Sequence, residues 1–286
     1  MPDVFIATAT VLPRPDEDDE PLRQALARRG VVAETRAWDD RDVPWGTARA
    51  CVIRSTWNYV QRHEQFLLWA ERCAALTRLV NSLEVVQWNV HKGYLVELAE
   101  RGLPVVPTSL VRRGQSASLE TLAGAAPEVV IKPAVSAGSL HTLRIVRADF
   151  AEGQRQLDEL AAGRDVLVQP YFRSVEGYGE RALVWIAGAL THAVRKHPRF
   201  AGDRQEVSEA MPIASDEREL AERLVAFAPG PLLYARIDLA RDEHGRPHLM
   251  ELELIEPALF LSRSPVALER LADAIAHVAH PGHVGG

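Results

Sequence analysis

Residues 234–257 read YARIDLARDEHGRPHLMELELIEP, two runs of alternating polar and apolar residues on either side of a charged turn. Because successive side chains of a strand point to opposite faces, Glu251 and Glu253 share one face and the intervening leucines share the other. If the two runs pair as a hairpin, Asp238 comes level with this acidic pair. The stretch therefore predicts an antiparallel hairpin with one acidic face and one apolar face.

The acidic face needs a partner if it is buried. Three carboxylates on one face repel one another, and burying them without partners is costly. A hard divalent cation resolves the conflict, and Mg²⁺ held by carboxylates and substrate phosphates fits best. We therefore predict that Asp238, Glu251 and Glu253 bind metal. The alternative is a solvated sheet face that binds nothing.

A second candidate feature is a loop of small residues that follows a buried strand. Lys132 ends the apolar run 128–132, and the loop 134–142 contains Ser136 and Gly138. Backbone amides in such a loop can approach phosphate oxygens closely, and a nearby lysine adds a positive charge. The P-loop pattern is absent, because no Gly-x4-Gly-Lys-Ser/Thr occurs and a strand is expected to follow.

Other basic and apolar segments are weaker signals when taken singly. Lys92 lies near the start of a predicted helix, and Arg195-Lys196 ends a predicted strand. A lone lysine at such a place is more often solvated or snorkelling. Residues 166–172, VLVQPYF, form an apolar run that stops at a proline. This is typical of a hinge whose backbone contacts a flat ring, and equally of any strand end.

Composition excludes several classes of protein. The 286 residues carry 33 basic and 39 acidic side chains, a net charge of −6, which argues against a protein that coats nucleic acid or an acidic membrane. No window approaches the roughly 18 apolar residues of a membrane span. The two cysteines cannot form a disulfide framework. We expect a cytoplasmic protein with no nucleic-acid or membrane partner.

The pattern of predicted elements changes along the chain. The first 80 residues alternate strands and helices, with strands at 4–9, 31–37 and 50–54, which predicts a parallel sheet covered by helices. A helix is predicted over 89–101. The remainder reads as short strands with few helices, including a hairpin that turns at Ala187-Gly188. The fold class is therefore α/β plus α+β.

Taken together, these residues resemble the ATP-grasp superfamily, whose motif order is kept from about residue 81 onward. The resemblance implies an N-terminal Rossmann-like pre-ATP-grasp domain at 1–84. A two-subdomain ATP-grasp fold would follow, with a central subdomain at 85–170 and a C-terminal subdomain at 171–286. Adenine would be wedged between the two subdomains.

The same resemblance implies site residues. Two Mg²⁺ ions would bind at Asp238, Glu251 and Glu253, although many members have asparagine where Glu253 stands. Arg236 and Lys196 would be catalytic. The implied ATP-binding residues are Lys92, Lys132, Ser136, Gly138, Gln169, Pro170, Tyr171, Phe172, Glu176, Glu180 and Lys196. For Glu176 and Glu180 the implied role is to bind the ribose hydroxyls, and plain surface charge is the competing interpretation.

Within the superfamily, three stretches resemble the O-ureido-D-serine cyclo-ligase group of D-cycloserine biosynthesis. They are residues 54–59, residues 179–196 and residues 251–257. The resemblance implies an ATP-dependent carboxylate–amine ligase that forms an acyl phosphate on a small amino-acid-like substrate. Ring closure and intermolecular ligation of an amino acid or peptide both stay open, as does a homodimer.

Substrate contacts are expected at the carboxyl edge of the N-terminal sheet, where open α/β sheets bind ligands. Arg54 follows a strand there and could clamp a carboxylate in a bidentate manner, and Ser55, Thr56, Trp57 and Tyr59 would shape the surrounding wall. A surface arginine beside core aromatics is the alternative. The acidic run 16–20 is expected to cap the next helix, and gripping a substrate amine is its second interpretation.

Two rival functions are left open. Residues 134–138, AVSAG, fall one residue short of Gly-x-Ser-x-Gly, and Asp238 and His277 follow Ser136 in the order of the α/β-hydrolases. A serine hydrolase would need a helix directly after Ser136 and would leave the acidic pair unused. An ATP-binding domain without turnover is the other rival. The tail 280–286 is expected to fray rather than pack.

Overall fold

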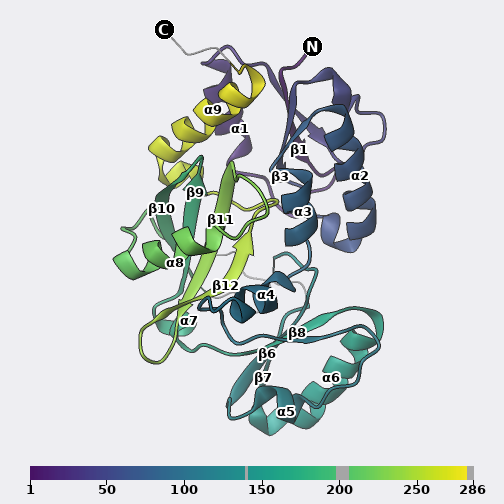
Figure 1. Cartoon of the computed structure of the whole chain (residues 1–286), viewed down its shortest axis with the longest axis vertical. Helices are drawn as coiled ribbons and strands as arrows, with labels where there is room; N and C mark the ends of the chain where they lie inside the picture. The colour runs from purple at the N-terminus through teal and green to yellow at the C-terminus, as the bar shows by residue number, and fades with distance from the viewer. Residues whose placement is uncertain (139–140, 198–205, 282–286) are drawn as a thin grey trace.

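The computed structural model describes residues 1–138, 141–197 and 206–281. Three four-stranded sheets organise these residues, with strand orders β2-β1-β3-β4, β5-β8-β6-β7 and β10-β9-β11-β12. Figure 1 shows the first at the top of the molecule, the third in the middle and the second at the bottom. Each sheet lies inside one of the three residue ranges predicted as domains, and the domain boundaries themselves stay a prediction.

The first sheet is parallel throughout, as predicted from the alternation of strands and helices. It and its helices comprise β1 (Val4–Thr8), α1 (Asp19–Ala27), β2 (Ala33–Ala37), β3 (Ala50–Ser55), α2 (His63–Leu76), β4 (Arg78–Val80) and α3 (Leu83–Asn89). Strand β3 is buried along its whole length, because helices cover both faces of a parallel sheet. Its carboxyl end delivers Arg54 and Ser55.

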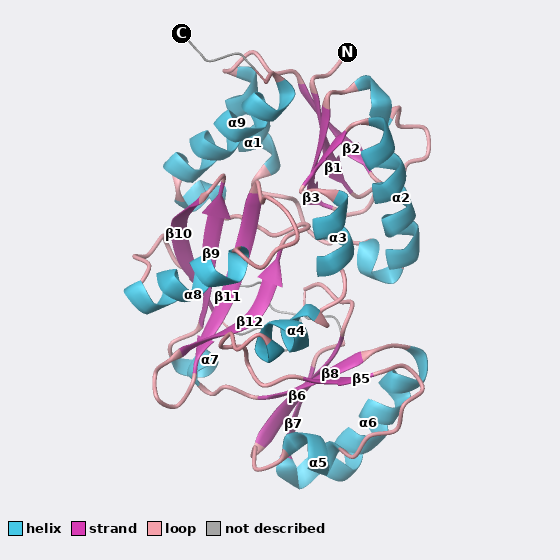
Figure 2. Ribbon diagram, viewed as in Figure 1, coloured by secondary structure: helices cyan, strands magenta, loops and turns pink. Residues whose placement is uncertain are grey.

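The second sheet is antiparallel, and two helices cover it (Figure 2). Its elements are β5 (Ser109–Val111), α5 (Leu119–Ala123), β6 (Glu128–Pro133), β7 (Leu143–Val146), α6 (Phe150–Gly163) and β8 (Val166–Pro170). The loop between β6 and β7 is the predicted small-residue loop. Gly138 has a φ of +61°, a conformation that glycine adopts without steric cost.

The third sheet is also antiparallel. Its elements are α7 (Ser174–Gly177), β9 (Glu180–Ile186), β10 (Ala189–Lys196), α8 (Ser215–Val225), β11 (Tyr234–Arg241), β12 (Pro247–Glu253) and α9 (Pro265–Ala279). Ala187 and Gly188 both have positive φ, as a two-residue hairpin turn between β9 and β10 requires. Short 3₁₀ turns elsewhere are η1 (Trp45–Thr47), η2 (Tyr59–Gln61), η3 (Arg147–Asp149) and η4 (Leu261–Arg263).

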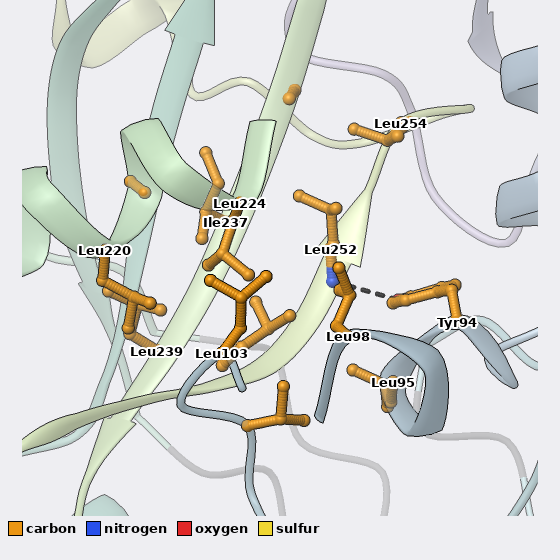
Figure 3. Close-up of a cluster of buried hydrophobic side chains, with 14 of the residues drawn as sticks. Tyr94, Leu95, Leu98, Leu103, Leu220, Leu224, Ile237, Leu239, Leu252 and Leu254 are labelled. Carbon is orange, nitrogen blue, oxygen red and sulfur yellow. Dashed lines mark hydrogen bonds between the residues drawn. The ribbon is translucent and has the colours of Figure 1, made fainter. Parts of the chain in front are cut away.

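The apolar face of the third sheet forms the core that fixes the hairpin. Leu252 and Ile237 pack there against α4 (Tyr94–Glu100) and α8, with Leu95, Leu98, Leu103, Leu220, Leu224 and Leu239 around them (Figure 3). The Leu252 amide donates to the Tyr94 hydroxyl at 3.0 Å. Burial of this face leaves the opposite, polar face of β11 and β12 for the site.

The predicted helix over 89–101 is wrong as a single element. The chain forms α3 and α4 instead, separated by a turn at 90–93. The Lys92 amide donates to the Ala134 carbonyl at 2.8 Å rather than continuing a helix. Lys92 therefore lies in a turn that is tied to the small-residue loop. Short elements β4, α5 and α7 were also not predicted.

The last helix returns to the first sheet. Helix α9 packs beside α1, and Leu271 and Ile275 share a buried cluster with Val4 and Ile6. Arg29 Nε lies 2.7 Å from the Asp273 carboxylate between the two helices. The N-terminal and third sheets thus form one continuous unit. The predicted fraying of 280–286 falls mainly on 282–286, outside the described residues. Among the described residues, no helix has the length and apolar character needed to cross a membrane.

Candidate active site

Strand register brings the predicted acidic residues together, as the alternation required. Glu251 pairs with Asp238 and Glu253 pairs with Arg236 across the β11–β12 ladder. Paired residues project to the same face of a sheet. Lys196, from β10, joins them through its side chain. One face of the third sheet therefore carries carboxylates and cations side by side.

Asp238 is buried between two cations. Arg236 approaches it with Nε at 2.9 Å from Oδ1 and Nη2 at 2.7 Å from Oδ2. Lys196 Nζ lies 2.7 Å from Oδ2. Burial alone would raise the pKa of Asp238, but Arg236 and Lys196 together hold that pKa well below its usual range. Asp238 is therefore a carboxylate at neutral pH.

Glu253 differs from Asp238 in its proton affinity. Arg236 Nη2 contacts its carboxylate. Burial raises the pKa of Glu253 to about 7, the neighbouring Glu251 and Asp238 raise it as well, and Arg236 opposes the shift. Glu253 thus gains or loses a proton close to neutral pH.

Lys92 links the small-residue loop to the acidic face. Its Nζ lies 3.2 Å from Glu251 Oε1 and 3.2 Å from the Ser136 hydroxyl, and it also donates to the Ser136 carbonyl. Burial would raise the pKa of Glu251, but Lys92 and Lys132 lower it overall. A single buried ammonium therefore connects three segments of the chain.

Lys132 is a buried cation at the end of β6. Burial lowers the pKa of its ammonium, and Glu251 partly reverses that shift. Within the described ranges, no carboxylate lies within 4 Å of its Nζ. A phosphate oxygen is a suitable partner for such a charge.

The acidic face does not need a metal ion to compensate its charge, so this part of the prediction is wrong. Lys92, Lys196 and Arg236 already compensate the three carboxylates. In the part of the chain that the structure describes, no group of three or more His, Cys, Asp or Glu side chains is arranged to hold a metal ion. The oxygen donors of Asp238, Glu251 and Glu253 suit Mg²⁺ in type, so metal binding there stays a prediction.

The predicted adenine hinge, residues 169–172, spans the end of β8 and the two residues after it. The Tyr171 amide donates to the Glu128 carbonyl at 3.0 Å, and Gln169 Nε2 donates to Thr108 Oγ1 at 2.8 Å, so both donors already have partners. Pro170 ends the strand, and the Phe172 ring packs edge-on against His248 at 5.5 Å between centroids. These contacts fix the segment that joins the second sheet to the third.

Both glutamates after the hinge make ion pairs. Glu176 lies 2.5 Å from Arg144, whose guanidinium stacks over the Tyr171 ring at 3.9 Å. Glu180 contacts Lys196 Nζ, and burial raises the pKa of Glu180. The competing interpretation of Glu180 as solvated surface charge is therefore wrong, while ribose binding by either residue stays a prediction.

The serine-hydrolase alternative has no structural support. The Ser136 hydroxyl donates to the Pro133 carbonyl at 3.1 Å. The described residues after it form turns and then β7, not the helix that a nucleophile elbow requires. His277 lies on α9, which packs on α1, β9 and β10.

Arg54 is buried, so its interpretation as a surface arginine is wrong. Its side chain is only 1% exposed and stacks over Tyr234 at 5.3 Å. Nη2 lies 3.5 Å from Asp18 Oδ2, and Nε and Nη1 have no hydrogen-bond partner among the described residues. Ser55 bonds to Thr8 at 2.9 Å, and the buried Thr56 hydroxyl has no partner among the same residues.

The aromatic residues of the same segment contact the strap after β12. Trp57 Nε1 donates to the Glu256 carbonyl at 3.0 Å, and Arg14 lies over the indole at 4.7 Å. Tyr59 stacks on Phe66 at 4.6 Å and shares a hydrogen bond with the Glu256 carboxyl. Tyr59 is thus a core residue whose hydroxyl reaches the site.

Two acidic residues that the sequence did not single out by themselves are buried beside the site. Asp18 was expected to help cap α1, yet its carboxylate makes no cap bond and accepts the amides of Leu259 and Leu261 at 2.9 and 2.8 Å. Burial raises the pKa of Glu256 to about 8. The sequence marked Glu256 only by its place in the ELELIEP motif and Asp18 only as a member of the acidic run 16–20.

Comparison with known proteins adds an independent line of evidence. Residues 4–81 match the family model of the N-terminal domain of D-cycloserine synthetase DcsG. The cycloserine biosynthesis protein DcsG of Streptomyces lavendulae is 33% identical over 284 residues, which cover 93% of this chain and 95% of that protein.

Solved structures agree with this likeness. The crystal structure of D-cycloserine synthetase DcsG is similar with a TM-score of 0.89 and 32% identity, over 96% of this chain and 99% of that one. The ATP-grasp ligase PsnB, complexed with a phosphomimetic variant of its minimal precursor, Mg and ADP, is similar with a TM-score of 0.67 and 14% identity, over 97% and 99%. The latter likeness establishes the ATP-grasp fold.

Proposed function

The chain belongs to the D-cycloserine synthetase DcsG family and has the fold of the ATP-grasp ligases, and on this premise we propose the reaction that it catalyses. It is an ATP-dependent ligase that phosphorylates the carboxylate of a small amino-acid-like substrate. An amine nitrogen then displaces the phosphate to form a C–N bond. In the proposed reaction the amine belongs to the same molecule, so that the product is a ring.

One observation carries this proposal. Four buried cations from different segments, Lys92, Lys132, Lys196 and Arg236, gather around the carboxylates of β11 and β12. Such a density of positive charge in a buried site suits the terminal phosphates of ATP. Before nucleotide binds, ion pairs with these carboxylates offset the free-energy cost of burying Lys92, Lys196 and Arg236.

The phosphates are assigned to three of these cations. Lys92 and Lys132 hold phosphate oxygens together with the amides of the loop that contains Ser136 and Gly138. Lys196 reaches the same oxygens from β10. Asp238, Glu251 and Glu253 hold Mg²⁺, which when bound supplies positive charge to the phosphate oxygens. The adenosine lies along residues 169–172, with Glu176 and Glu180 near its ribose.

The reaction balances in two steps. A carboxylate oxygen attacks the γ-phosphorus, the bond to the β-phosphate oxygen breaks, and ADP leaves. The amine nitrogen then attacks the acyl carbon, loses a proton and expels phosphate. Arg236 stabilises negative charge on the transferred group, since a preorganised guanidinium pays no reorganisation cost at that moment.

Isotope transfer tests the acyl phosphate directly. Substrate candidates labelled with ¹⁸O in the carboxylate are incubated with Mg-ATP, and the released phosphate is analysed by mass spectrometry. The proposal expects one ¹⁸O atom in each phosphate. Phosphate without ¹⁸O contradicts carboxylate activation.

Product mass separates ring closure from intermolecular ligation. Ring closure gives a product derived from one substrate molecule, whereas ligation gives a product that contains two. A product of two molecules would favour the intermolecular alternative and leave the acyl-phosphate proposal standing.

A further inference from the structure

Strand β12 lies at one edge of the third sheet, yet its outer edge is hydrogen-bonded. An edge strand leaves every second backbone N–H and C=O without a strand partner. At Leu249 the chain before β5 supplies the partners. The Leu249 amide donates to the Pro104 carbonyl at 2.9 Å, and the Leu249 carbonyl accepts the Val106 amide at 2.9 Å. From Leu252 onward, side chains supply the partners instead.

Asn89 takes the place of a residue of a neighbouring strand. Its side-chain Nδ2 donates to the Leu252 carbonyl at 2.8 Å, and its Oδ1 accepts the Leu254 amide at 2.9 Å. A carboxamide has one donor end and one acceptor end, so it reproduces the donor and acceptor of a backbone residue. These two bonds hold the residues on either side of Glu253.

Two further side chains complete this edge. The Leu252 amide donates to the Tyr94 hydroxyl at 3.0 Å (Figure 3). Asn81 Nδ2 donates to the Leu254 carbonyl at 2.7 Å, and Asn81 Oδ1 accepts the Leu233 amide at 2.8 Å. The amides and carbonyls of Leu252 and Leu254 therefore all have partners. The three side chains that supply these partners are buried.

A β-bulge explains why this part of β12 depends on its outer edge. Asp238 and Leu239 are consecutive on β11, but their partners Glu251 and Leu249 are not, so Met250 is an extra residue. The bulge lets Leu249 enter the apolar core while Glu251 faces the site. A bulge also interrupts the ladder of hydrogen bonds. Contacts on the outer edge therefore decide how firmly the acidic end of β12 is held.

The segment that holds this edge also carries Lys92. Asn89 and Tyr94 lie on either side of this lysine in the sequence. Lys92 Nζ lies 3.2 Å from Glu251 Oε1. One short segment therefore contacts the backbone of the acidic strand and also places an ammonium against its side chains.

We propose that Asn89 is a positioning residue that, together with Tyr94, sets the spacing between Lys92 and the carboxylates of β12. This inference rests on the proposed ligase function, in which Glu251 and Glu253 hold Mg²⁺ and Lys92 holds phosphate oxygens. Asn89 acts through the backbone of β12. A misplacement of about 1 Å can lower the rate of an oriented reaction about a hundredfold, so such a residue matters for transfer.

Gln154 offers a matched control in another sheet of the molecule. On α6, its Oε1 accepts the Leu119 amide at 2.7 Å and its Nε2 donates to the Ala117 carbonyl at 2.9 Å. This carboxamide holds the residues on either side of one backbone position, as Asn89 does, but it contacts the cover of the second sheet. Asn89→Leu and Gln154→Met remove the two carboxamides with little change of side-chain shape.

The affinity for ADP separates positioning from stability. Isothermal titration calorimetry of the full chain gives the Kd of ADP with EDTA and with Mg²⁺, and the ratio of these constants measures what Mg²⁺ contributes. We expect Mg²⁺ to tighten ADP binding about tenfold or more in the wild-type protein and in Gln154→Met. Lower stability alone reduces the fraction of protein that binds and leaves both constants unchanged.

Asn89→Leu should lose most of this Mg²⁺ ratio, because the carboxylates of β12 shift relative to the phosphates. Its Kd for ADP with EDTA should change little, since the Lys92 amide is held independently by the Ala134 carbonyl at 2.8 Å. A carboxamide that only stabilises the fold would give the same ratio in Asn89→Leu and in Gln154→Met.

Hydrogen exchange in the ligand-free protein gives a readout that needs neither metal nor nucleotide. The Leu254 amide loses its acceptor in Asn89→Leu, so it should exchange about tenfold faster or more relative to the amide of Ile237 on the interior strand β11. In Gln154→Met the relative rate should equal that of the wild-type protein.

Tyr94→Phe is a milder variant that tests the inference even if Asn89→Leu does not fold. It removes only the hydroxyl that accepts the Leu252 amide. The Leu252 amide should then exchange faster relative to Ile237. The Mg²⁺ ratio should fall below that of Gln154→Met, by less than in Asn89→Leu.

Two results would overturn the inference. One is a Mg²⁺ ratio in the folded variants of Asn89 and Tyr94 that equals the ratio of Gln154→Met. The other is unchanged relative exchange of the Leu252 and Leu254 amides in those variants. ADP that binds the wild-type protein equally well with Mg²⁺ and with EDTA, or not at all, would reject the metal and nucleotide assignments of the proposed function, and this inference with them.

Discussion

Two regions of this molecule bury charge, and they do so in opposite ways. On β11 and β12, Asp238 and Glu251 are matched by Arg236, Lys196 and Lys92 within hydrogen-bond or ion-pair distance. At the end of β3, Arg54 is equally buried, yet two of its nitrogens have no partner among the described residues. The charges on β11 and β12 are paired with one another, whereas the guanidinium at the end of β3 is only partly paired.

The difference indicates what each region contributes. A self-compensated network holds its side chains in place before ligand binds, which suits a site that must position phosphates for transfer. A buried cation with unpaired donors gains favourable interaction energy when a ligand supplies the missing hydrogen-bond acceptors. Substitutions that remove one charge should therefore lower the free energy of unfolding by very different amounts in the two regions.

The largest expected effect is on turnover. Glu251→Gln should lower ATP-dependent phosphate release by about a hundredfold or more, because it removes charge at the predicted metal position and the partner of Lys92. Steady-state phosphate release measures this. Glu243→Gln, an exposed glutamate on the turn of the same hairpin, should leave the rate unchanged. A normal rate for Glu251→Gln would remove the metal assignment.

The next effect is on folding. Asp238→Asn should lower the free energy of unfolding by about 3 kcal/mol, because it leaves Arg236 and Lys196 buried without their shared counter-ion. Urea denaturation of the variant and of Glu243→Gln gives the difference. Equal unfolding midpoints would mean that the network on β11 contributes little and that the contrast with Arg54 is false.

A pH effect follows from Glu256. Its pKa of about 8 in the folded protein is above that of an exposed glutamate, so the folded state binds more protons than the unfolded state between about pH 4.5 and 8. Stability should therefore fall as pH rises across this window. Glu256→Gln should flatten that fall and stabilise the protein at pH 8 by about 1–3 kcal/mol.

Urea denaturation at pH 5, 6, 7 and 8 measures this dependence. Glu253, with a pKa of about 7, contributes a second fall of the same sign that persists in the variant. Identical profiles for the variant and the wild-type protein would contradict the assignment of a protonated Glu256.

Replacing Arg54 tests the contrast between the two regions most directly. Arg54→Gln should change the free energy of unfolding by only about 0–1 kcal/mol in the absence of substrate, because the guanidinium has few contacts to lose. Arg236→Gln, its matched counterpart, should cost several times more. Arg54→Gln should still raise KM for the amino-acid substrate at least tenfold. A large loss of stability in Arg54→Gln would show that the two regions are alike.

The sequence predicts well what short-range periodicity controls. The alternation around Glu251 and Glu253 places both on one face whatever else the chain does, and the structure agrees. The parallel first sheet and the turn at Ala187-Gly188 follow from equally local patterns. The family likeness was accessible for the same reason, since its motifs keep their order.

Long-range partners could not be predicted. Asp18 is held by amides 241 and 243 residues away, so nothing near it distinguishes it from an acid that caps a helix. The break before α4 depends on the Ala134 carbonyl, which captures the amide of Lys92. The pairing of Asp238 with Lys196 likewise requires a contact across 42 residues, so its geometry could not be predicted from the residues near either side chain.

The packing of α9 against α1 has a consequence for synthesis of the chain. Leu271 and Ile275 complete the same buried cluster as Val4 and Ile6, and Figure 1 shows both helices beside the strands that begin the chain. On the ribosome, the opening strands must wait, with part of their apolar surface uncovered, until α9 has left the exit tunnel. Folding of this protein is therefore expected to finish after translation of α9 rather than domain by domain from the N-terminus.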